Sequence, residues 1–263
     1  MQRRSVLVFA GLDPSGGAGI SADIEAIGAM GAHALPIVTA LTVQDNDRVF
    51  AVNPVDAAII RHQAQVLSDK IAIAAVKIGI VGNRANAEAI ADVIRALRQK
   101  QPDLPVVLDT VLSSGHGDAL SNDKPEAALQ GLIAQATLVA PNLPEAARLC
   151  PGIDTQQAQA QHLLSLGARH VLIKGGHGAS EHDVVNHWFT QNDGHAWNWQ
   201  RIPGEFHGSG CTLASAIAGL LAQRKPMREA LTLAQHYAHQ TLATAYQIAT
   251  GQRIPHRGTR FPE

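Results

Sequence analysis

Cysteine is scarce in this chain, which has 263 residues and 2 cysteines, Cys150 and Cys211. So few thiols cannot build the disulfide framework that stabilises small secreted domains. The scarcity predicts a protein of a reducing compartment, and we expect a cytoplasmic location.

Long apolar runs and an excess of charge of one sign are also lacking. No apolar stretch approaches the ~18 residues that a membrane-spanning helix needs, and the run near the N-terminus breaks at Gly11, Asp13 and Pro14 without a cleavage site of small residues. Lysine and arginine number 21 against 22 aspartate and glutamate residues. This balance argues against nucleic-acid and membrane partners, so we expect a small-molecule ligand.

Apolar material is abundant enough for a large core, with 46% hydrophobic and 16% charged residues. The length exceeds the usual ~100 to 200 residues of a domain, but single α/β domains commonly reach ~250 residues. No repeat, linker or charge run marks a boundary. We expect one domain over residues 1–263.

Short β-branched runs alternate with segments of helical spacing. The expected buried strands cover residues 6–11, 34–43, 74–81, 105–111, 137–142 and 170–176. The expected helices between them include residues 20–31, 55–70 and 85–100. This order predicts an α/β protein with a parallel sheet, in which ligands bind beyond the carboxyl ends of the strands.

The last third of the chain is less regular. A turn signal at Asn192–Gly194 predicts a hairpin at one sheet edge within residues 179–204. Two helices are expected over 211–223 and 226–249, and residues 250–263 read as a loose tail.

The strongest local signal is a glycine-rich run that leads into a helix. Gly208, Ser209 and Gly210 precede Cys211 there, and their small side chains leave backbone N–H groups open to a phosphate or a developing anion. The positive helix terminus would favour the thiolate of Cys211, which could then act as a base. An ordinary helix start with a buried cysteine is the alternative.

Two carboxylates follow neighbouring strands and could approach each other. Asp109 ends one expected strand, and Glu145 lies just after the next strand along the chain. The two carboxylates could therefore hold hydrated Mg²⁺ together. Alternatively, Glu145 is a first-turn residue of a helix that Asn142 caps. Lys174 also ends a strand and, with Asn142, is a candidate for nucleotide contacts, although a strand-end lysine can simply reach solvent.

A second glycine-rich loop, residues 10–23, follows the first strand. It matches neither the P-loop nor the dinucleotide fingerprint. We expect Gly11 to let a substrate approach the backbone and Asp23 to offer a polar contact, unless that aspartate merely caps a turn or helix.

Seven segments taken together resemble one family. AGLDPSGGAGISAD, TALTVQ, VKIGIV, VVLDTVL, APNLPEA, LIKGGHG and HGSGCTL are similar, in this order, to motifs of the hydroxymethylpyrimidine and phosphomethylpyrimidine kinases within the ribokinase-like superfamily. The resemblance implies a three-layer α/β/α fold and ATP-dependent phosphorylation of a pyrimidine alcohol and then of its monophosphate in thiamin biosynthesis. It further implies Mg²⁺ as a cofactor and a homodimer.

The resemblance also implies roles for single residues. Gln44 would hydrogen-bond the aminopyrimidine, which suits an amide that donates and accepts. Ile80, where the family usually has Met, would form part of the wall beside it. Residues 208–211 would form the anion hole, with Cys211 helping to deprotonate the substrate, while Lys174 would lie by the nucleotide.

Two other functions remain open at the level of the sequence. A pyridoxal kinase also phosphorylates a hydroxymethyl group on a six-membered nitrogen heterocycle. A pyrimidine-binding domain without turnover could keep the same fold, because a fold alone does not establish activity.

Overall fold

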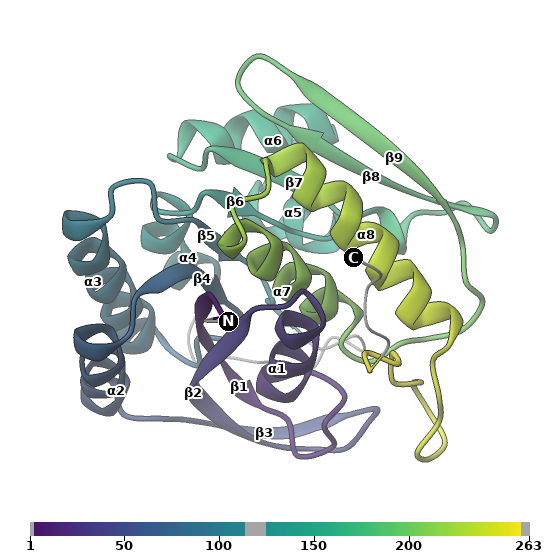
Figure 1. Cartoon of the computed structure of the whole chain (residues 1–263). Coiled ribbons are helices and arrows are strands. Elements are labelled where there is room, and N and C mark those ends of the chain that lie inside the picture. Colours follow the sequence, from purple (N-terminus) through teal and green to yellow (C-terminus); the bar gives the residue numbers. More distant parts are fainter. Residues whose placement is uncertain (1–2, 114–124, 259–263) are drawn as a thin grey trace.

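A nine-stranded sheet between two layers of helices dominates the protein (Figure 1). The computed structural model describes residues 3–113 and 125–258. The strands are β1 (Ser5–Leu12), β2 (His33–Gln44), β3 (Val49–Pro54), β4 (Ile73–Ile78), β5 (Val106–Leu108), β6 (Leu138–Val139), β7 (His170–Ile173), β8 (Asp183–Phe189) and β9 (Gly194–Gln200). The helices are α1 (Gly19–Ala29), α2 (Ala57–Lys70), α3 (Arg84–Lys100), α4 (Pro125–Ile133), α5 (Leu143–Leu149), α6 (Gln156–Ser165), α7 (Ser209–Ala222) and α8 (Met227–Ala243).

The strand order is β3-β2-β1-β4-β5-β6-β7-β8-β9. Neighbours from β2 to β7 pair in parallel, whereas β3 pairs antiparallel with β2, and β8 antiparallel with both β7 and β9. The chain passes from β1 to β2 on one side and later to β4 on the other, so the direction of winding reverses at β1. Open α/β sheets place their ligand sites at such a switch point.

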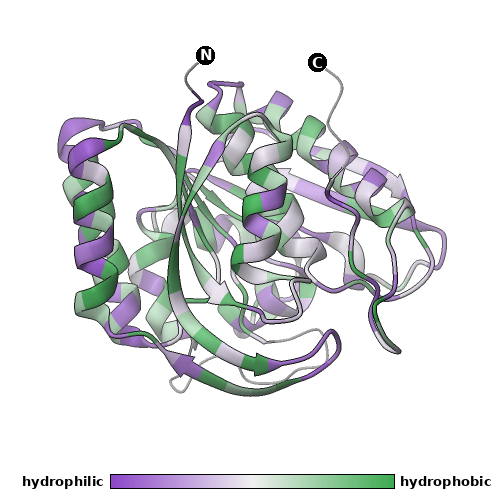
Figure 2. Ribbon diagram, turned by 60° about the horizontal axis from the view of Figure 1, so that its bottom comes forward, coloured by the Kyte–Doolittle hydropathy of each residue, from purple (hydrophilic) through white to green (hydrophobic). Residues whose placement is uncertain are grey.

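Alternate residues of each strand belong to different cores, as the pleat of a strand requires. In β1, Leu7 and Phe9 pack with α2 to α6, whereas Val6, Val8 and Ala10 pack with α1, α7 and α8. Figure 2 shows the same division, with hydrophobic strands at the centre and helices that turn their polar sides outward. The three-layer arrangement that the resemblance implied is therefore confirmed.

The expected parallel strands and the hairpin are confirmed, with β8 and β9 joined through the Asn192–Gly194 turn region. The edge strand β3 and the helices α4 and α6 were not predicted. The helix expected over 226–249 ends at Ala243, where the chain turns toward the isolated bridge between Tyr246 and Ile254. None of the helices in residues 3–113 and 125–258 combines the length and apolar character needed to cross a membrane.

The reading of residues 250–263 as a loose tail is wrong for residues 250–258; residues 259–263 lie outside the described residues. Ile254 is buried, and Arg257 is only 2% exposed. Arg253 forms a parallel bridge with Phe206, just before the glycine-rich run. The polar composition concealed this packing because the segment is held mainly through backbone hydrogen bonds and one buried guanidinium.

Candidate active site

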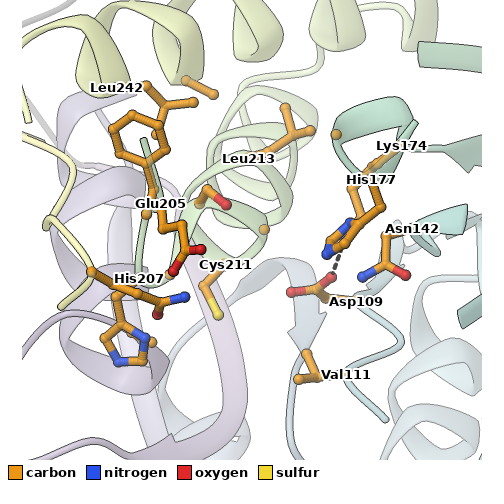
Figure 3. A pocket seen from close by; sticks show the side chains of 18 of the residues that line it. Asp109, Val111, Asn142, Lys174, His177, Glu205, His207, Cys211, Leu213 and Leu242 are labelled. Atoms are coloured by element: carbon orange, nitrogen blue, oxygen red, sulfur yellow. Dashed lines mark hydrogen bonds and ion pairs between the residues drawn. The ribbon is translucent and has the colours of Figure 1, made fainter. Parts of the chain in front are cut away.

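A cavity of about 760 Å³ opens at the carboxyl ends of the central strands. This volume lies within the range of small-molecule sites. The cavity is lined by all the predicted site residues except Asp23, namely Gly11, Gln44, Ile80, Asp109, Asn142, Glu145, Lys174, Gly208, Ser209, Gly210 and Cys211. Residues far apart in the sequence thus meet beside the switch point of the sheet, with Cys211 and His207 on one side and Asp109 and Lys174 on the other (Figure 3).

The glycine-rich run forms the N-terminus of α7. Gly208 is the N-cap residue, in the left-handed region with φ 77°, and no side chain of the described residues caps the helix. The first N–H groups of a helix have no acceptor within it, so those of Ser209, Gly210 and Cys211 are available to a ligand. A side chain at Gly208 would also collide with the backbone, because its Cβ would lie 2.1 Å from the carbonyl oxygen of Gly17.

The thiol of Cys211 lies between the two glycine-rich loops and receives a hydrogen bond from the backbone of Gly19. Burial raises the pKa of Cys211 to about 11, against the opposing effect of the Lys77 ammonium, while Asp109 and Asp23 raise it further. The prediction that the helix terminus favours a thiolate is therefore wrong, because burial outweighs it. At neutral pH Cys211 is a thiol.

Lys174 and Asp109 form an ion pair that faces the start of α7. The Nζ atom of Lys174 donates to Oδ1 of Asp109 at 2.8 Å, as Figure 3 draws. Burial alone would lower the pKa of Lys174, but the carboxylates of Asp109 and Glu145 raise it, so the side chain is a cation at neutral pH. A Cβ on Gly210 would lie 3.3 Å from this Nζ atom, so the anion loop is immediately beside the ion pair.

Glu145 and Asn142 build the start of α5 as a capping box. The Asn142 side chain accepts from the backbone N–H of Glu145, and Oε2 of Glu145 accepts from the backbone N–H of Asn142, both at 2.8 Å. Thr110 donates to the same Oε2 atom at 3.2 Å. Burial raises the pKa of Glu145, and Asp109 adds to the rise while Lys174 opposes it. The capping alternative is therefore realised, at a position that also faces the cavity.

Only one carboxylate oxygen of Asp109 takes part in the ion pair with Lys174. Its Oδ2 atom is buried and has no hydrogen-bond partner among the described residues. Hydrated Mg²⁺ in phosphoryl-transfer sites needs only one or two carboxylates together with phosphate oxygens, so these residues fit that ion. The described part of the chain offers no group of three or more His, Cys, Asp or Glu side chains for a metal. A cation here would take its other ligands from phosphate and water.

The opposite end of the cavity carries the heterocycle candidates. Gln44, at the end of β2, lies 3.3 Å from Nε2 of His207, which in turn lies 2.8 Å from Oδ2 of Asp13. A carboxylate can only accept, so Nε2 of His207 carries the proton. The amide nitrogen of Gln44 faces this ring, and the Gln44 side chain lines the cavity.

Gly11 and Ile80 form the adjoining wall. A Cβ on Gly11 would touch Ile80 at 3.6 Å, so a larger residue there would fill space beside the isoleucine. Both line the cavity, which supports the predicted approach of a flat ligand to the backbone at the end of β1.

Asp23 is the predicted site residue that the structure places elsewhere. It is fully buried and forms an ion pair with Lys77 at 2.8 Å, while Ser215 donates to its Oδ1 at 2.6 Å. Both oxygens are engaged below the cavity floor, so the expected direct contact with a substrate is wrong. Lys77, its partner, lines the cavity.

Comparison with known proteins shows which family has this sequence. A model of the family described as phosphomethylpyrimidine kinase matches residues 13–256. The chain belongs to this family. The hydroxymethylpyrimidine/phosphomethylpyrimidine kinase of Rhizobium meliloti (strain 1021) is 36% identical over 260 residues, covering 94% of this chain and 93% of the relative.

Solved structures of this family and of pyridoxal kinases share the fold. The phosphomethylpyrimidine kinase from Clostridium difficile 630 has a TM-score of 0.76 and 31% identity, and the match covers 90% of this chain and 98% of that one. An ADP complex of Bacillus subtilis pyridoxal kinase has a TM-score of 0.84 and 25% identity, with coverage of 97% and 98%. The sequence resemblance to the phosphomethylpyrimidine kinase family and the ribokinase-like fold are therefore confirmed.

His207 lines the cavity and was not among the site residues predicted from the sequence. Its side chain is 15% exposed and hydrogen-bonds Asp13. Burial alone would raise the pKa of Asp13, but the hydrogen bonds from His207 and Ser15 together lower it. The signal available was its position directly before the glycine-rich run.

The far end of the cavity was missed as well. Gln235 of α8 accepts from Asn186 at 2.8 Å and from Trp199 at 3.1 Å, and Asn186 accepts from the backbone N–H of Gly175. Asn186, Trp199 and Gln235 line the cavity beyond Lys174. They come from the hairpin of β8 and β9 and from α8, which carry no recognisable motif, so the sequence did not predict that these residues lie together.

Proposed function

We propose that the chain transfers the γ-phosphoryl group of ATP to the hydroxymethyl group of 4-amino-5-hydroxymethyl-2-methylpyrimidine, and then phosphorylates the monophosphate, in thiamin biosynthesis. One observation carries the proposal. A single cavity joins an amide-bearing pocket at Gln44, an open anion loop at Gly208–Cys211 and the Asp109–Lys174 pair, in the order that acceptor, transferred phosphoryl and nucleotide require.

The residues divide the work along the cavity. Gln44 orients the aminopyrimidine, with Gly11 and Ile80 beside the ring. The N–H groups of Ser209, Gly210 and Cys211 stabilise charge on the transferring phosphoryl group, and Lys174 pairs with the phosphate oxygens. As the new O–P bond forms and the bond to the ADP leaving group breaks, the hydroxyl proton passes to Sγ of Cys211 in its thiolate form, which is the minor species at neutral pH.

Mg²⁺, held by Asp109 with Glu145 close by, would neutralise phosphate charge and fix the geometry of the phosphates. The Oδ2 atom of Asp109, which has no hydrogen-bond partner within residues 3–113 and 125–258, supports this assignment. Asn142 lies where the start of α5 meets the cavity, which supports its proposed place beside the nucleotide.

The test is ATP-dependent phosphate transfer to hydroxymethylpyrimidine, to its monophosphate and to pyridoxal, with Mg²⁺ present and each product identified by mass. We expect both pyrimidines to be phosphorylated. Transfer to pyridoxal alone would make the protein a pyridoxal kinase. Ligand binding without ATP consumption would identify a non-catalytic pyrimidine-binding domain.

Gln44→Ala is expected to weaken pyrimidine binding by about 10-fold to 100-fold, the effect of losing about one or two hydrogen bonds to a buried polar group, while kcat at saturating substrate changes much less. Isothermal calorimetry with the pyrimidine measures this directly. Gln191→Ala, in the exposed turn between β8 and β9, serves as the matched control. Equal pyrimidine affinity in the Gln44 variant would refute the assignment.

A homodimer and a cytoplasmic location belong to the same proposal. The edge hairpin of β2 and β3 exposes large apolar side chains, with Leu41 50%, Val43 54% and Phe50 69% exposed. Contiguous exposed apolar side chains are typical of protein interfaces, which supports pairing of two copies through this hairpin. Both cysteines are free thiols, which supports a reducing compartment.

A further inference from the structure

The segment after α8 runs directly against the approach to the anion loop. The backbone N–H of Arg253 donates to the carbonyl of Glu205, and that of His207 donates to the carbonyl of Arg253, both at 2.9 Å. Four residues later the side chain of Arg257 enters the protein behind the two glycine-rich loops.

The Arg257 guanidinium contacts three separate elements. Its Nε atom donates to the hydroxyl of Thr212 in the first turn of α7 at 2.8 Å. A terminal nitrogen donates to the carbonyl of Gly17 in the first glycine-rich loop, and the other lies 3.4 Å from Glu25 of α1. A planar guanidinium can bridge several acceptors in a fixed geometry, so it links the loop, α1 and α7.

The two glycine-rich loops touch at the point that Arg257 holds. A Cβ on Gly208 would lie 2.1 Å from the Gly17 carbonyl oxygen and 2.9 Å from a guanidinium nitrogen. Thr212 donates its hydroxyl to the Gly208 carbonyl at 2.8 Å. The guanidinium therefore fixes, through Gly17 and Thr212, the backbone that precedes the free N–H groups of the anion loop.

Attachment of the C-terminal segment does not depend on this side chain. The hydroxyl of Tyr237 donates to the backbone carbonyl of Arg257, and His256 donates its N–H to the carbonyl of Thr241, both at 3.0 Å. Asn46 donates to the carbonyls of Thr250 and Gln252. Burying a cation is costly. The ionic partner of Arg257, Glu25, is 53% exposed, so the charge of the guanidinium is only partly neutralised. This charge lies behind a loop that would bind phosphate.

We propose that Arg257 is a positioning residue for phosphoryl transfer, which sets the spacing between the first glycine-rich loop and the anion loop. This role rests on the proposed kinase function. A displacement of about 1 Å in a site of this kind costs up to roughly 10²-fold in rate, and the buried positive charge favours the anion in the loop.

The test compares Arg257→Ala, Arg257→Lys and Thr212→Val with Arg228→Ala, an exposed arginine of α8, as the matched control. We expect kcat to fall about 10-fold to 100-fold in Arg257→Ala, with the KM for pyrimidine and for ATP changed less than about threefold. Low concentrations of guanidinium ion should restore part of the lost kcat. Arg257→Lys should remain impaired, because an ammonium cannot bridge both loops, and Thr212→Val should lose kcat in the same direction.

Hydrogen exchange provides a readout that does not depend on activity. Residues 206–213 and 13–19 should exchange faster in Arg257→Ala than in the wild type without any substrate, with unchanged protection elsewhere in the sheet. Unchanged exchange together with unchanged kcat in Arg257→Ala would overturn the proposal. A loss of kcat that guanidinium does not restore, and that is proportional to the unfolded fraction of the variant, would overturn it as well. An inactive wild type with faster loop exchange in the variant would instead refute the kinase function alone.

Discussion

Replacing Cys211 with alanine is expected to lower kcat about 10²-fold or more while leaving the affinity for the pyrimidine nearly unchanged, because the hydroxymethyl group loses its proton acceptor. The thiol stands at the start of α7, where the substrate hydroxyl must approach the anion loop. Steady-state kinetics with hydroxymethylpyrimidine, together with calorimetry, separate the two effects. Unchanged turnover would remove Cys211 from the mechanism.

The pH dependence of kcat sharpens this expectation. With its pKa raised by burial to about 11, the thiolate fraction at pH 7 is on the order of 10⁻⁴. A rate that needs the thiolate should therefore rise about tenfold per pH unit between pH 7 and 9, whereas Cys211→Ala should be flat over this range. An equally flat wild-type profile would mean that the thiol acts without giving up its proton.

Cys150→Ala is the matched control for both measurements. That residue is buried, has a pKa likewise raised to about 11 by burial, and lies in the core against α6 rather than in the cavity. The substitution removes a cysteine and leaves a small void, so stability should fall while kcat stays the same. A matching loss of kcat in Cys150→Ala would show that the effect at Cys211 comes from repacking.

The parallel centre of the sheet could be predicted because its strands are buried on both faces and read as short continuous apolar runs. The edge strand β3 was missed although residues 49–52 are apolar, because this run is only four residues long and lies at an edge where every residue of Val49–Pro54 is exposed or half-buried. The same reasoning failed for the C-terminal segment. A fully buried arginine is rare, so Arg257 in a polar stretch looked like surface.

The candidate site was predictable where function leaves a local pattern. Glycines before a helix, as at Gly208 and Gly210, indicate an anion site from the chain alone. Pairings across the fold do not, because no local spacing joins Asp23 to Lys77 or His207 to Asp13; each pair connects segments that only the folded sheet brings together. Burial is equally invisible locally, which is why the acidity of Cys211 was predicted with the wrong sign.

Removing one partner of the buried pair of Lys77 and Asp23 should cause the largest single loss of stability among the charged groups described. Both side chains are 0% exposed, and Nζ lies 2.8 Å and 3.0 Å from the two carboxylate oxygens. Burial alone would lower the pKa of Lys77, but the surrounding acidic groups, chiefly Asp23, together outweigh burial and raise it, so the lysine is charged. Ser215 completes the environment of the carboxylate.

Lys77→Met is therefore expected to lower the free energy of unfolding by about 3–5 kcal/mol, because it leaves an uncompensated carboxylate in the core. Lys77→Met/Asp23→Asn should recover most of this loss, since the asparagine oxygen can still accept from Ser215. Urea unfolding of the two variants measures both values.

The surface pair of Lys225 and Glu229 offers a control at the same separation, 2.8 Å, but with both side chains 44% exposed. Lys225→Met should cost no more than about 0.5 kcal/mol, as for an exposed pair on one helix face. If Lys77→Met cost as little, or if the double variant were no more stable than the single one, the buried carboxylate would not be the source of the penalty. The Lys77 charge also lowers the pKa of Cys211. In the folded fraction of Lys77→Met, Cys211 should therefore react more slowly with iodoacetamide. That result would show that the buried pair influences the acidity of Cys211.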